Sequence, residues 1–306
     1  MFGGISIERI TMAECNVCFR RCKISDGELG FCKARRAVEG RVISDTYGKF
    51  TALALDPIEK KPLYHFYPGS VIVSAGGYGC NLACPFCQNS DISLSEQGQA
   101  GSSDKVNKIT GKAAFPVTKK YEPEELADIC EHYRSQGNIG IAFTYNEPLI
   151  SYEFIIDTAK ILKKMNLKTV LVTNGSASQE TLDKVAPYVD AMNVDLKSFD
   201  ENYYKNVLKG DLQTTKEFIE SAVYFSHVEV TTLVVPGDND SEEEMEKISS
   251  WLASVGTKAG KDIPLHVTRF FPMSLYSDRQ PTEVEKVYKL ADVARKHLRF
   301  VHEGNV

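Results

Sequence analysis

The sequence has little of what marks several common protein classes. It contains eight cysteines and one tryptophan among 306 residues, too little cysteine for a disulfide scaffold. No apolar run approaches the roughly 18–20 residues that a membrane-spanning helix needs, so we expect no membrane association. Basic residues do not outnumber acidic ones (36 against 41, net charge −5), which argues against a surface built throughout for nucleic acid.

The beginning of the chain also lacks the pattern of an export signal. Residues 1–15 show no basic region followed by an apolar core, so we expect no signal peptide and a cytoplasmic protein. The composition, 42% hydrophobic and 25% charged, is typical of a folded globular protein. The length allows one large domain, or a domain with an appendage.

From residue 71 onward, short β-branched runs alternate with longer amphipathic segments. The pattern predicts six strands, at 71–76, 139–145, 168–174, 190–196, 228–237 and 264–271. It predicts six helices, near 122–136, 151–165, 178–187, 212–225, 241–257 and 281–298. This alternation indicates parallel βα units, arranged either as an open doubly wound sheet or as a barrel of fewer than eight units. Both arrangements place the chemistry at the C-terminal ends of the strands.

Two stretches depart from this alternation. Residues 1–70 show little regular period and contain four clustered cysteines, so we predict a small metal-binding lobe that precedes a core domain over 71–306. Residues 91–121 form an insert with weak structural signals and five lysines. Loops of this length in compact domains are usually functional or disordered.

Three cysteines directly follow the first strand of the core. Cys80, Cys84 and Cys87, in GYGCNLACPFCQN, have the spacing C-x3-C-x2-C. This trio is one ligand short of a four-cysteine iron–sulfur site, and a [4Fe–4S] cluster held by three thiolates keeps one iron free for a non-protein ligand. A zinc site that borrows a distant ligand and three plain buried thiols are the alternatives, but no second cysteine pair follows in this loop.

The position of this loop resembles that in the radical S-adenosylmethionine (SAM) enzymes. With CNVCFRRCKISDGELGFC, DPIEKKPLYHFYPGS, FTYNEP and RFFP, the sequence is similar to the radical SAM member of the AmmeMemoRadiSam system, related to pyruvate formate-lyase activating enzymes. The resemblance implies a partial (β/α)6 TIM-type barrel with the N-terminal lobe appended. It also implies a [4Fe–4S] cluster, SAM, and a reductant such as flavodoxin or ferredoxin. SAM would be cleaved to a 5′-deoxyadenosyl radical that abstracts hydrogen from a substrate.

The resemblance also places candidate SAM-binding residues at the ends of the strands. They are Phe86, Tyr145, Asn146, Glu147, Thr173, Asn174, Asn193, Asp195, Lys197 and His266. Glu147 can hold an ammonium group by a charge-assisted hydrogen bond, although this stretch also reads as a plain turn into the next helix. Asn193, Asp195 and Lys197 share one strand face, which favours a polar lumen over a merely structural ion pair. A single histidine on an apolar strand, such as His266, is more often a core residue whose hydrogen bonds are satisfied.

The first cysteine cluster consists of Cys15, Cys18, Cys22 and Cys32. Four thiols within 18 residues suit structural zinc, which we favour, or an accessory iron–sulfur cluster. Residues 20–41 carry seven arginines or lysines and three acidic groups. These cations would offset the charge of a thiolate–metal centre, or bind a phosphorylated substrate or RNA. The remaining cysteine, Cys130, reads as a packing residue.

The substrate, a small molecule or a protein side chain, is not identified by these motifs. Two narrower hypotheses are an activase of a glycyl-radical enzyme and an RNA- or tRNA-modifying enzyme. The insert 91–121 has no cysteine, unlike that of many activases, and only the basic residues at 20–41 favour RNA. A non-enzymatic electron carrier is disfavoured by the missing fourth ligand.

Overall fold

The computed structural model describes residues 12–93 and 116–306. Its largest element is an eight-stranded sheet with the order β14-β13-β12-β11-β10-β9-β7-β6. The strands are β6 (Ala52–Pro57), β7 (Val71–Gly76), β9 (Asn138–Thr144), β10 (Lys168–Thr173), β11 (Ala191–Asp195), β12 (His227–Val234), β13 (Leu265–Arg269) and β14 (Val301–Gly304). The strands from β7 to β14 run parallel, and β6 pairs antiparallel with β7.

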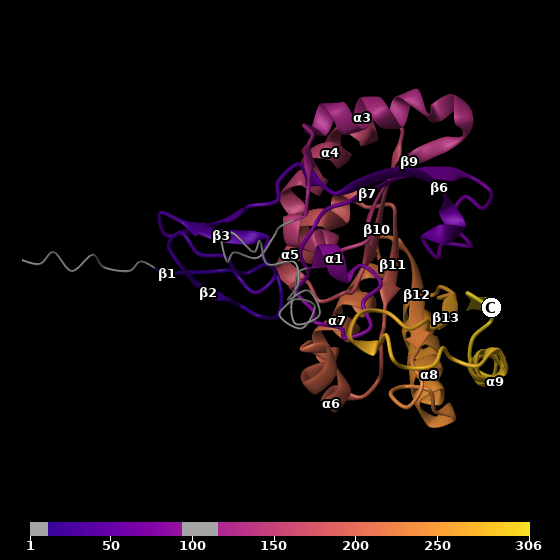
Figure 1. Ribbon diagram of the computed structural model, residues 1–306. Helices are drawn as coiled ribbons and strands as arrows, with labels where there is room; N and C mark the ends of the chain where they lie inside the picture. The colour runs from indigo at the N-terminus through magenta and orange to yellow at the C-terminus, as the bar shows by residue number, and fades with distance from the viewer. Residues whose placement is uncertain (1–11, 94–115) are drawn as a thin grey trace, which may run out of the picture.

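Six longer helices connect the parallel strands, close to where the sequence predicts them. They are α3 (Pro123–His132), α4 (Tyr152–Lys164), α5 (Gln179–Val185), α7 (Leu212–Ala222), α8 (Glu242–Ala259) and α9 (Val284–Arg295). The strand order never reverses along the sheet, so right-handed crossovers place these helices on one face. Successive helices accordingly pack together, α3 with α4, α4 with α5, and α8 with α9 (Figure 1). This winding is that of a partial barrel, which decides between the two arrangements left open by the sequence.

Two strands of the sheet are not among the six predicted from sequence. β14 is only four residues long and carries a histidine and a glutamate, so it shows no apolar run. β6 lies within the range predicted as the N-terminal lobe, yet its six residues pair with β7 from Gly76 to Val71. Residues 52–57 therefore belong to the core sheet, because β7 needs a hydrogen-bonding partner on its free edge.

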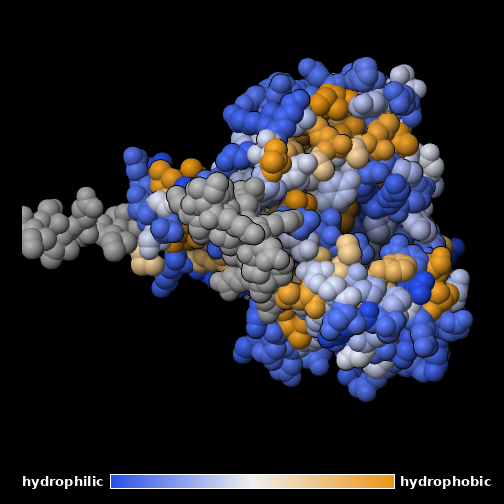
Figure 2. Space-filling model, in the orientation of Figure 1, coloured by the Kyte–Doolittle hydropathy of each residue, from blue (hydrophilic) through white to orange (hydrophobic). Residues whose placement is uncertain are grey.

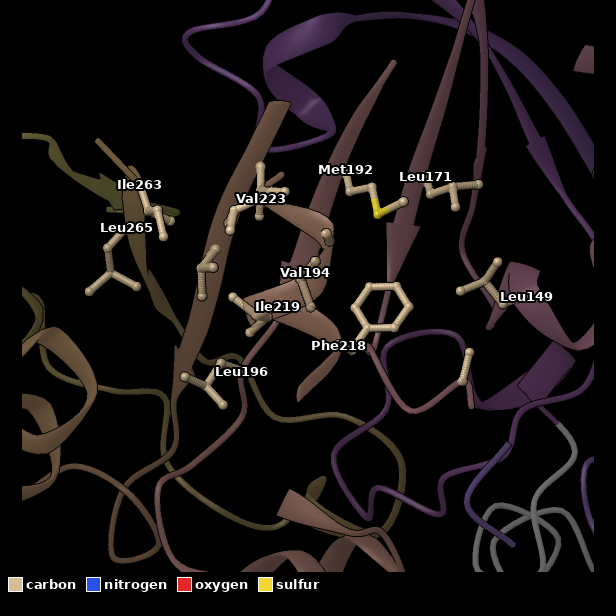
Figure 3. Packing of buried hydrophobic residues seen from close by; sticks show 14 of the residues in the cluster. Leu149, Leu171, Met192, Val194, Leu196, Phe218, Ile219, Val223, Ile263 and Leu265 are labelled. Carbon is tan, nitrogen blue, oxygen red and sulfur yellow. The ribbon is translucent and has the colours of Figure 1, made fainter. Parts of the chain in front are cut away.

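The main core lies between the sheet and the helices. Figure 3 shows Leu171 of β10 and Met192 and Val194 of β11 beside Phe218 and Ile219 of α7. All five side chains are at most 2% exposed. Removing such side chains from water stabilises the fold by about 25 cal/mol for each Å² of apolar surface.

A short segment closes the N-terminal end of the barrel on the opposite face of the sheet. We call residues 58–66 the plug; it begins with the 3-10 helix η1 (Ile58–Lys60). Ile58, Leu63 and Phe66 of the plug pack on one residue from each of four strands, namely Ile72, Ala142, Val170 and Ala191. The plug thus fills the N-terminal half of the lumen with apolar side chains.

The N-terminal lobe lies beside the sheet, at the left of Figure 1. It contains two antiparallel pairs, β1 (Met12–Glu14) with β2 (Lys23–Ser25) and β3 (Arg35–Val38) with β4 (Arg41–Ser44). Ser178, which follows β10, donates its backbone N–H to Val17 O of the lobe. The lobe therefore contacts the rim at the C-terminal ends of the strands.

Residues 94–115 of the predicted insert 91–121 lie outside the described residues. Near its end, β8 (Lys119–Lys120) pairs with β5 (Lys49–Phe50). The face shown in Figure 2 is largely hydrophilic, with apolar residues in separate patches. Among the described residues, none of the helices is long and apolar enough to span a bilayer.

Shortening one plug side chain should destabilise the whole barrel. Leu63 is 0% exposed, so Leu63→Ala leaves a cavity and should lower the free energy of unfolding by about 2–5 kcal/mol. Leu275→Ala is the matched control because Leu275 is 39% exposed, and its effect should stay below about 1 kcal/mol. Urea unfolding followed by circular dichroism measures both. Equal losses would show that the plug does not contribute to the core.

Candidate active site

A cavity of about 670 Å³ occupies the lumen between the plug and the C-terminal ends of the strands. It is lined by the three cysteines of the C-x3-C-x2-C loop and by nine of the ten candidate SAM-binding residues. These nine are Phe86, Tyr145, Asn146, Glu147, Thr173, Asn174, Asp195, Lys197 and His266. Residues separated by up to 186 positions in the sequence thus share one cavity, because the parallel strands end at one rim.

Cys80, Cys84 and Cys87 lie in the loop that follows β7. Burial raises the pKa of Cys84 to about 12 and also raises those of Cys80 and Cys87. The thiols therefore keep their protons until a cation binds, and metal binding releases these protons. Leu82 donates its backbone N–H to Cys80 Sγ at 3.4 Å, and Asn174 donates its Nδ2–H at 3.7 Å. Such hydrogen bonds to sulfur tune cluster-bound thiolates.

Within 12–93 and 116–306, no three His, Cys, Asp or Glu side chains are gathered to hold a metal ion. An iron–sulfur cluster needs wider spacing than a single ion, because each thiolate binds a different iron. Three thiols, N–H donors directed at sulfur and the volume of the cavity suit such a cluster.

The turn after β9 connects three parts of the site. Asn146 accepts a hydrogen bond from Gly77 N at 3.1 Å and donates one to Gly79 O at 3.1 Å, so it braces the cysteine loop. Glu147 accepts from Thr173 Oγ1 at 2.8 Å and from Asn174 N at 2.8 Å, which ties the ends of β9 and β10 together. The turn is therefore more than a connection into the next helix.

Glu147 is a strongly perturbed carboxyl group. Its side chain lines the cavity but the residue is only 2% exposed, and burial raises its pKa to about 7 although its hydrogen bonds oppose the shift. A carboxyl group poised near neutrality loses its proton readily when a cation binds beside it. An ammonium group is therefore a suitable ligand at this position.

Asp195 and Lys197 form an ion pair at the end of β11. Lys197 Nζ lies 3.0 Å from Asp195 Oδ2, and both residues line the cavity. Burial alone would lower the pKa of Lys197, but the charge of the neighbouring Asp195 carboxylate and its hydrogen bond outweigh it and raise the pKa. Lys197 is thus a permanent cation beside the cysteine loop.

Asn193 is the candidate that does not line the cavity. Its Nδ2 donates to Pro62 O of the plug and to Thr231 Oγ1, both at 2.9 Å. The predicted polar face of this strand is therefore divided along its length. Asp195 and Lys197 face the cavity, whereas Asn193 lies one pleat deeper and binds the plug.

His266 lies toward the floor of the cavity and is held by a residue that the sequence analysis did not identify. Its Nε2 is 2.7 Å from Glu229 Oε2 of β12. The fully buried Glu229 carboxylate also accepts from His227 Nε2 and from the backbone N–H groups of Tyr64 and His65. The sequence signal was an acidic residue inside the apolar strand VEVTTLVV, where an unpaired charge would be costly.

The plug supplies further lining residues that sequence reasoning missed, Lys61 and Tyr64. The Tyr64 ring packs edge-on against His266 at 4.7 Å between centroids. Lys61 and Tyr64 belong to the segment DPIEKKPLYHFYPGS, which carried part of the family resemblance. Nothing in the local pattern indicated that this segment enters the lumen, because only the antiparallel turn from β6 directs it there.

The four N-terminal cysteines line one small cavity in the lobe. Cys15, Cys18 and Cys32 are at most 7% exposed. Arg35 lines the same cavity and its buried Nε has no hydrogen-bond partner among the described residues, although its Nη1 pairs with Glu153 at 2.7 Å. An unpaired buried donor beside four thiols suits a site whose bound thiolates accept hydrogen bonds.

The lobe approaches the cysteine loop of the core closely. Gly79 has φ +88°, and a Cβ atom there would overlap Cys32 O. Arg20 donates its Nε–H to Asn81 O at 2.7 Å. Gly79 therefore makes room for the lobe beside the cysteine loop.

Replacing Glu229 should flatten the dependence of stability on pH. Burial alone would raise the pKa of Glu229, but hydrogen bonds from His227, His266 and the His65 backbone N–H outweigh it and lower the pKa to about 2. This stabilisation is complete above the ordinary carboxyl pKa of about 4.5 and is lost as the pH falls toward 2. Wild-type protein should lose on the order of 2 kcal/mol through this group between pH 6 and 3.

Glu229→Gln should lack this loss and should already be less stable at pH 6. Glu285→Gln, at an exposed position on α9, is the control and should keep the wild-type slope. Unfolding free energies at several pH values measure all three proteins. A slope unchanged in Glu229→Gln would contradict the assignment.

Comparisons with known proteins agree with this geometry. Residues 75–249 match the model of the Radical SAM superfamily. The chain is 36% identical over 294 residues to Uncharacterized protein MJ0808 of Methanocaldococcus jannaschii, covering 95% of this chain and 81% of that protein. It is 25% identical to the pyruvate formate-lyase-activating enzyme of Clostridium pasteurianum, over 58% of this chain and 67% of that protein.

Among solved structures, QueE from Escherichia coli has a TM-score of 0.51 at 13% identity, covering 83% of this chain and 92% of QueE. This likeness shows a shared fold. The family model covers more than half of the chain and includes the cysteine loop and the ends of β9, β10 and β11. The chain therefore belongs to the radical SAM superfamily and is an enzyme that uses a [4Fe–4S] cluster and SAM.

Proposed function

We propose that Cys80, Cys84 and Cys87 hold the [4Fe–4S] cluster and that the polar strand ends around them bind SAM. The observation that carries this proposal is that three thiols and nine polar or aromatic candidate residues line one cavity. Bound together, the cluster and SAM supply a 5′-deoxyadenosyl radical that removes hydrogen from a substrate.

The protein residues have distinct tasks in this proposal. Asn146 and Glu147 bind the amino group of SAM, and Glu147 is charged once that ammonium is present. Lys197 balances the negative charge of the thiolates from its position near Cys84. Phe86 is 4% exposed, and the centre of its ring lies 6.0 Å from that of Tyr276. It helps to exclude water from the cysteine loop.

The substrate occupies the part of the cavity nearer the plug. Tyr64, Thr231 and His266 line that part, so the substrate carries polar groups that can hydrogen-bond there. A low-potential one-electron donor, a flavodoxin or a ferredoxin, supplies the electron. The activating-enzyme relative makes another protein a second candidate substrate. The link to the AmmeMemoRadiSam system stays a prediction.

The structure weakens the case for RNA as a substrate. Of the seven basic residues at 20–41, Arg35 pairs with Glu153 and Arg36 with Asp45 at 2.6 Å. Arg20 donates to backbone carbonyls of the core. Basic residues whose side chains are already paired within the protein contribute less to a phosphate-binding surface.

We also propose that Cys15, Cys18, Cys22 and Cys32 bind a metal that stabilises the lobe, with zinc favoured over an iron–sulfur cluster. Support comes from four thiols around one small cavity and from the unpaired Nε of Arg35. Metal binding would draw the thiols together and release their protons. Zinc–thiolate sites of this closed type contribute directly to folding.

Cys84→Ala should abolish both the cluster and SAM cleavage. Two thiolates are too few to retain a [4Fe–4S] cluster, so the visible absorbance of the cluster and the formation of 5′-deoxyadenosine should both disappear. Cys130→Ala is the matched control, because Cys130 lies in the hydrophobic core on α3, and it should retain both. Wild-type protein with an intact, reduced cluster that forms no 5′-deoxyadenosine from SAM would refute the proposed function.

Cys22→Ala should remove the metal of the lobe. Metal analysis of anaerobically purified protein should find one zinc per chain in the wild type, and little in Cys22→Ala, because three thiolates bind zinc more weakly than four. Cys130→Ala should keep the wild-type zinc content. A wild type with two [4Fe–4S] clusters per chain and no zinc would overturn the zinc assignment.

A further inference from the structure

One residue of the site has an unusual backbone conformation. Tyr145, between β9 and Asn146, has φ +73°, a left-handed conformation that glycine adopts freely but a bulky side chain does not. Strained backbone of this kind persists only where the surroundings hold it, and it clusters at ligand-binding sites. The contacts of Tyr145 therefore identify what holds the turn.

Tyr145 is held by β6 and by the residues that follow it. Its hydroxyl donates to Asp56 Oδ2 at 3.1 Å, and Lys61 Nζ lies 2.9 Å from the same oxygen. The Lys61 ammonium is also 5.0 Å from the centre of the Tyr145 ring. A Cβ atom at Gly76 would overlap that ring, so the glycine at the end of β7 provides its space. We call Asp56, Lys61 and Tyr145 the clamp.

The clamp is charged and largely shielded from solvent. Burial alone would raise the pKa of Asp56, but its hydrogen bonds and the Lys61 ammonium outweigh it and lower the pKa to about 2. The side chain of Lys61 is 3% exposed and that of Asp56 is 14% exposed. The Tyr145 hydroxyl therefore meets a permanent carboxylate, which makes a stronger hydrogen bond than a neutral acceptor.

Three successive residues of the turn thus bind three different elements. Tyr145 binds Asp56 of β6, Asn146 binds the cysteine loop, and Glu147 binds the end of β10. The first of these bonds fixes the strained residue directly before Asn146 and Glu147. The motif DPIEKKP, to which the proposed function assigns no role, supplies both Asp56 and Lys61.

We propose that the clamp of Asp56, Lys61 and Tyr145 positions Asn146 and Glu147 for SAM, so that the antiparallel strand β6 and the plug set the affinity for this cofactor. This inference rests on the proposed function, because it takes SAM as the ligand of that turn. Without the clamp the turn samples other conformations, and the apparent dissociation constant rises as the competent fraction falls. Asp56, Lys61 and Tyr145 act as positioning residues.

The experiment compares Tyr145→Phe and Asp56→Asn with Tyr47→Phe. Tyr47 is the matched control because its hydroxyl donates to Asp157 at 2.9 Å, the same type of bond, and it does not line the cavity. Each protein is purified anaerobically with its cluster, and its iron content and thermal midpoint are recorded. SAM binding is measured by calorimetry, and by the change that SAM causes in the electron paramagnetic resonance spectrum of the reduced cluster.

Tyr145→Phe and Asp56→Asn should each weaken SAM binding roughly tenfold, the effect of losing one hydrogen bond to a charged group. The double variant should lose little more than either single variant, because both remove one interaction. Tyr47→Phe should bind SAM like the wild type. Tyr145→Gly, which relieves the strain but removes the clamp, should fold and should also bind SAM weakly.

The inference is overturned if Tyr145→Phe binds SAM like the wild type or if Tyr47→Phe weakens binding equally. It is also overturned if Tyr145→Gly binds SAM normally, because the turn would then need no clamp. Wild-type protein that binds SAM but never cleaves it refutes the proposed function alone, while the variants still test the clamp. Wild-type protein that does not bind SAM refutes both.

Discussion

The site depends on one constraint, the handedness of the connections between parallel strands. Because each crossover is right-handed and the strand order from β7 to β14 follows the chain, the six connecting helices lie on one face and the parallel strands end at one rim. The loops after β7, β9, β10 and β11 therefore meet, and they bring Cys84, Glu147, Asn174 and Lys197 to one cavity. Reversal of the strand order at any point would send part of this set to the opposite side of the sheet.

A polar lumen is costly unless its groups are paired, and here each major charge has a partner. Lys197 pairs with Asp195, Lys61 with Asp56, and Glu229 accepts from two histidines and two backbone N–H groups. Such networks are rigid when fully satisfied, because any displacement exposes an unpaired charge to a low dielectric. Glu147 differs from these paired groups, because burial raises its pKa to about 7. A cationic ligand beside it would stabilise its charged form.

Much of the core domain could be predicted because its strands and helices have clear periods. The six predicted strands and six helices are confirmed within a few residues, and nine of the ten candidate residues line the cavity. Asn193 shares a strand face with Asp195, as alternation predicts, but it lies deeper and binds the plug, since alternation gives the face and not the distance from the rim. β14 and β6 were missed because one is short and polar and the other lies in a segment without period.

The sequence by itself determined the chemistry, since three thiols in one short loop after a strand indicate an iron–sulfur cluster with an open iron. Only the tertiary structure decided how the site is held. Glu229 lies far in sequence from His266, and Asp56 lies far from Tyr145, yet each pair is hydrogen-bonded. No local pattern encodes a contact made across a barrel. The tertiary structure likewise places the N-terminal lobe against the cysteine loop, where Gly79 leaves room for Cys32 O. The spacing of residues along the chain identifies the ligands, whereas contacts between distant strands hold these ligands in place.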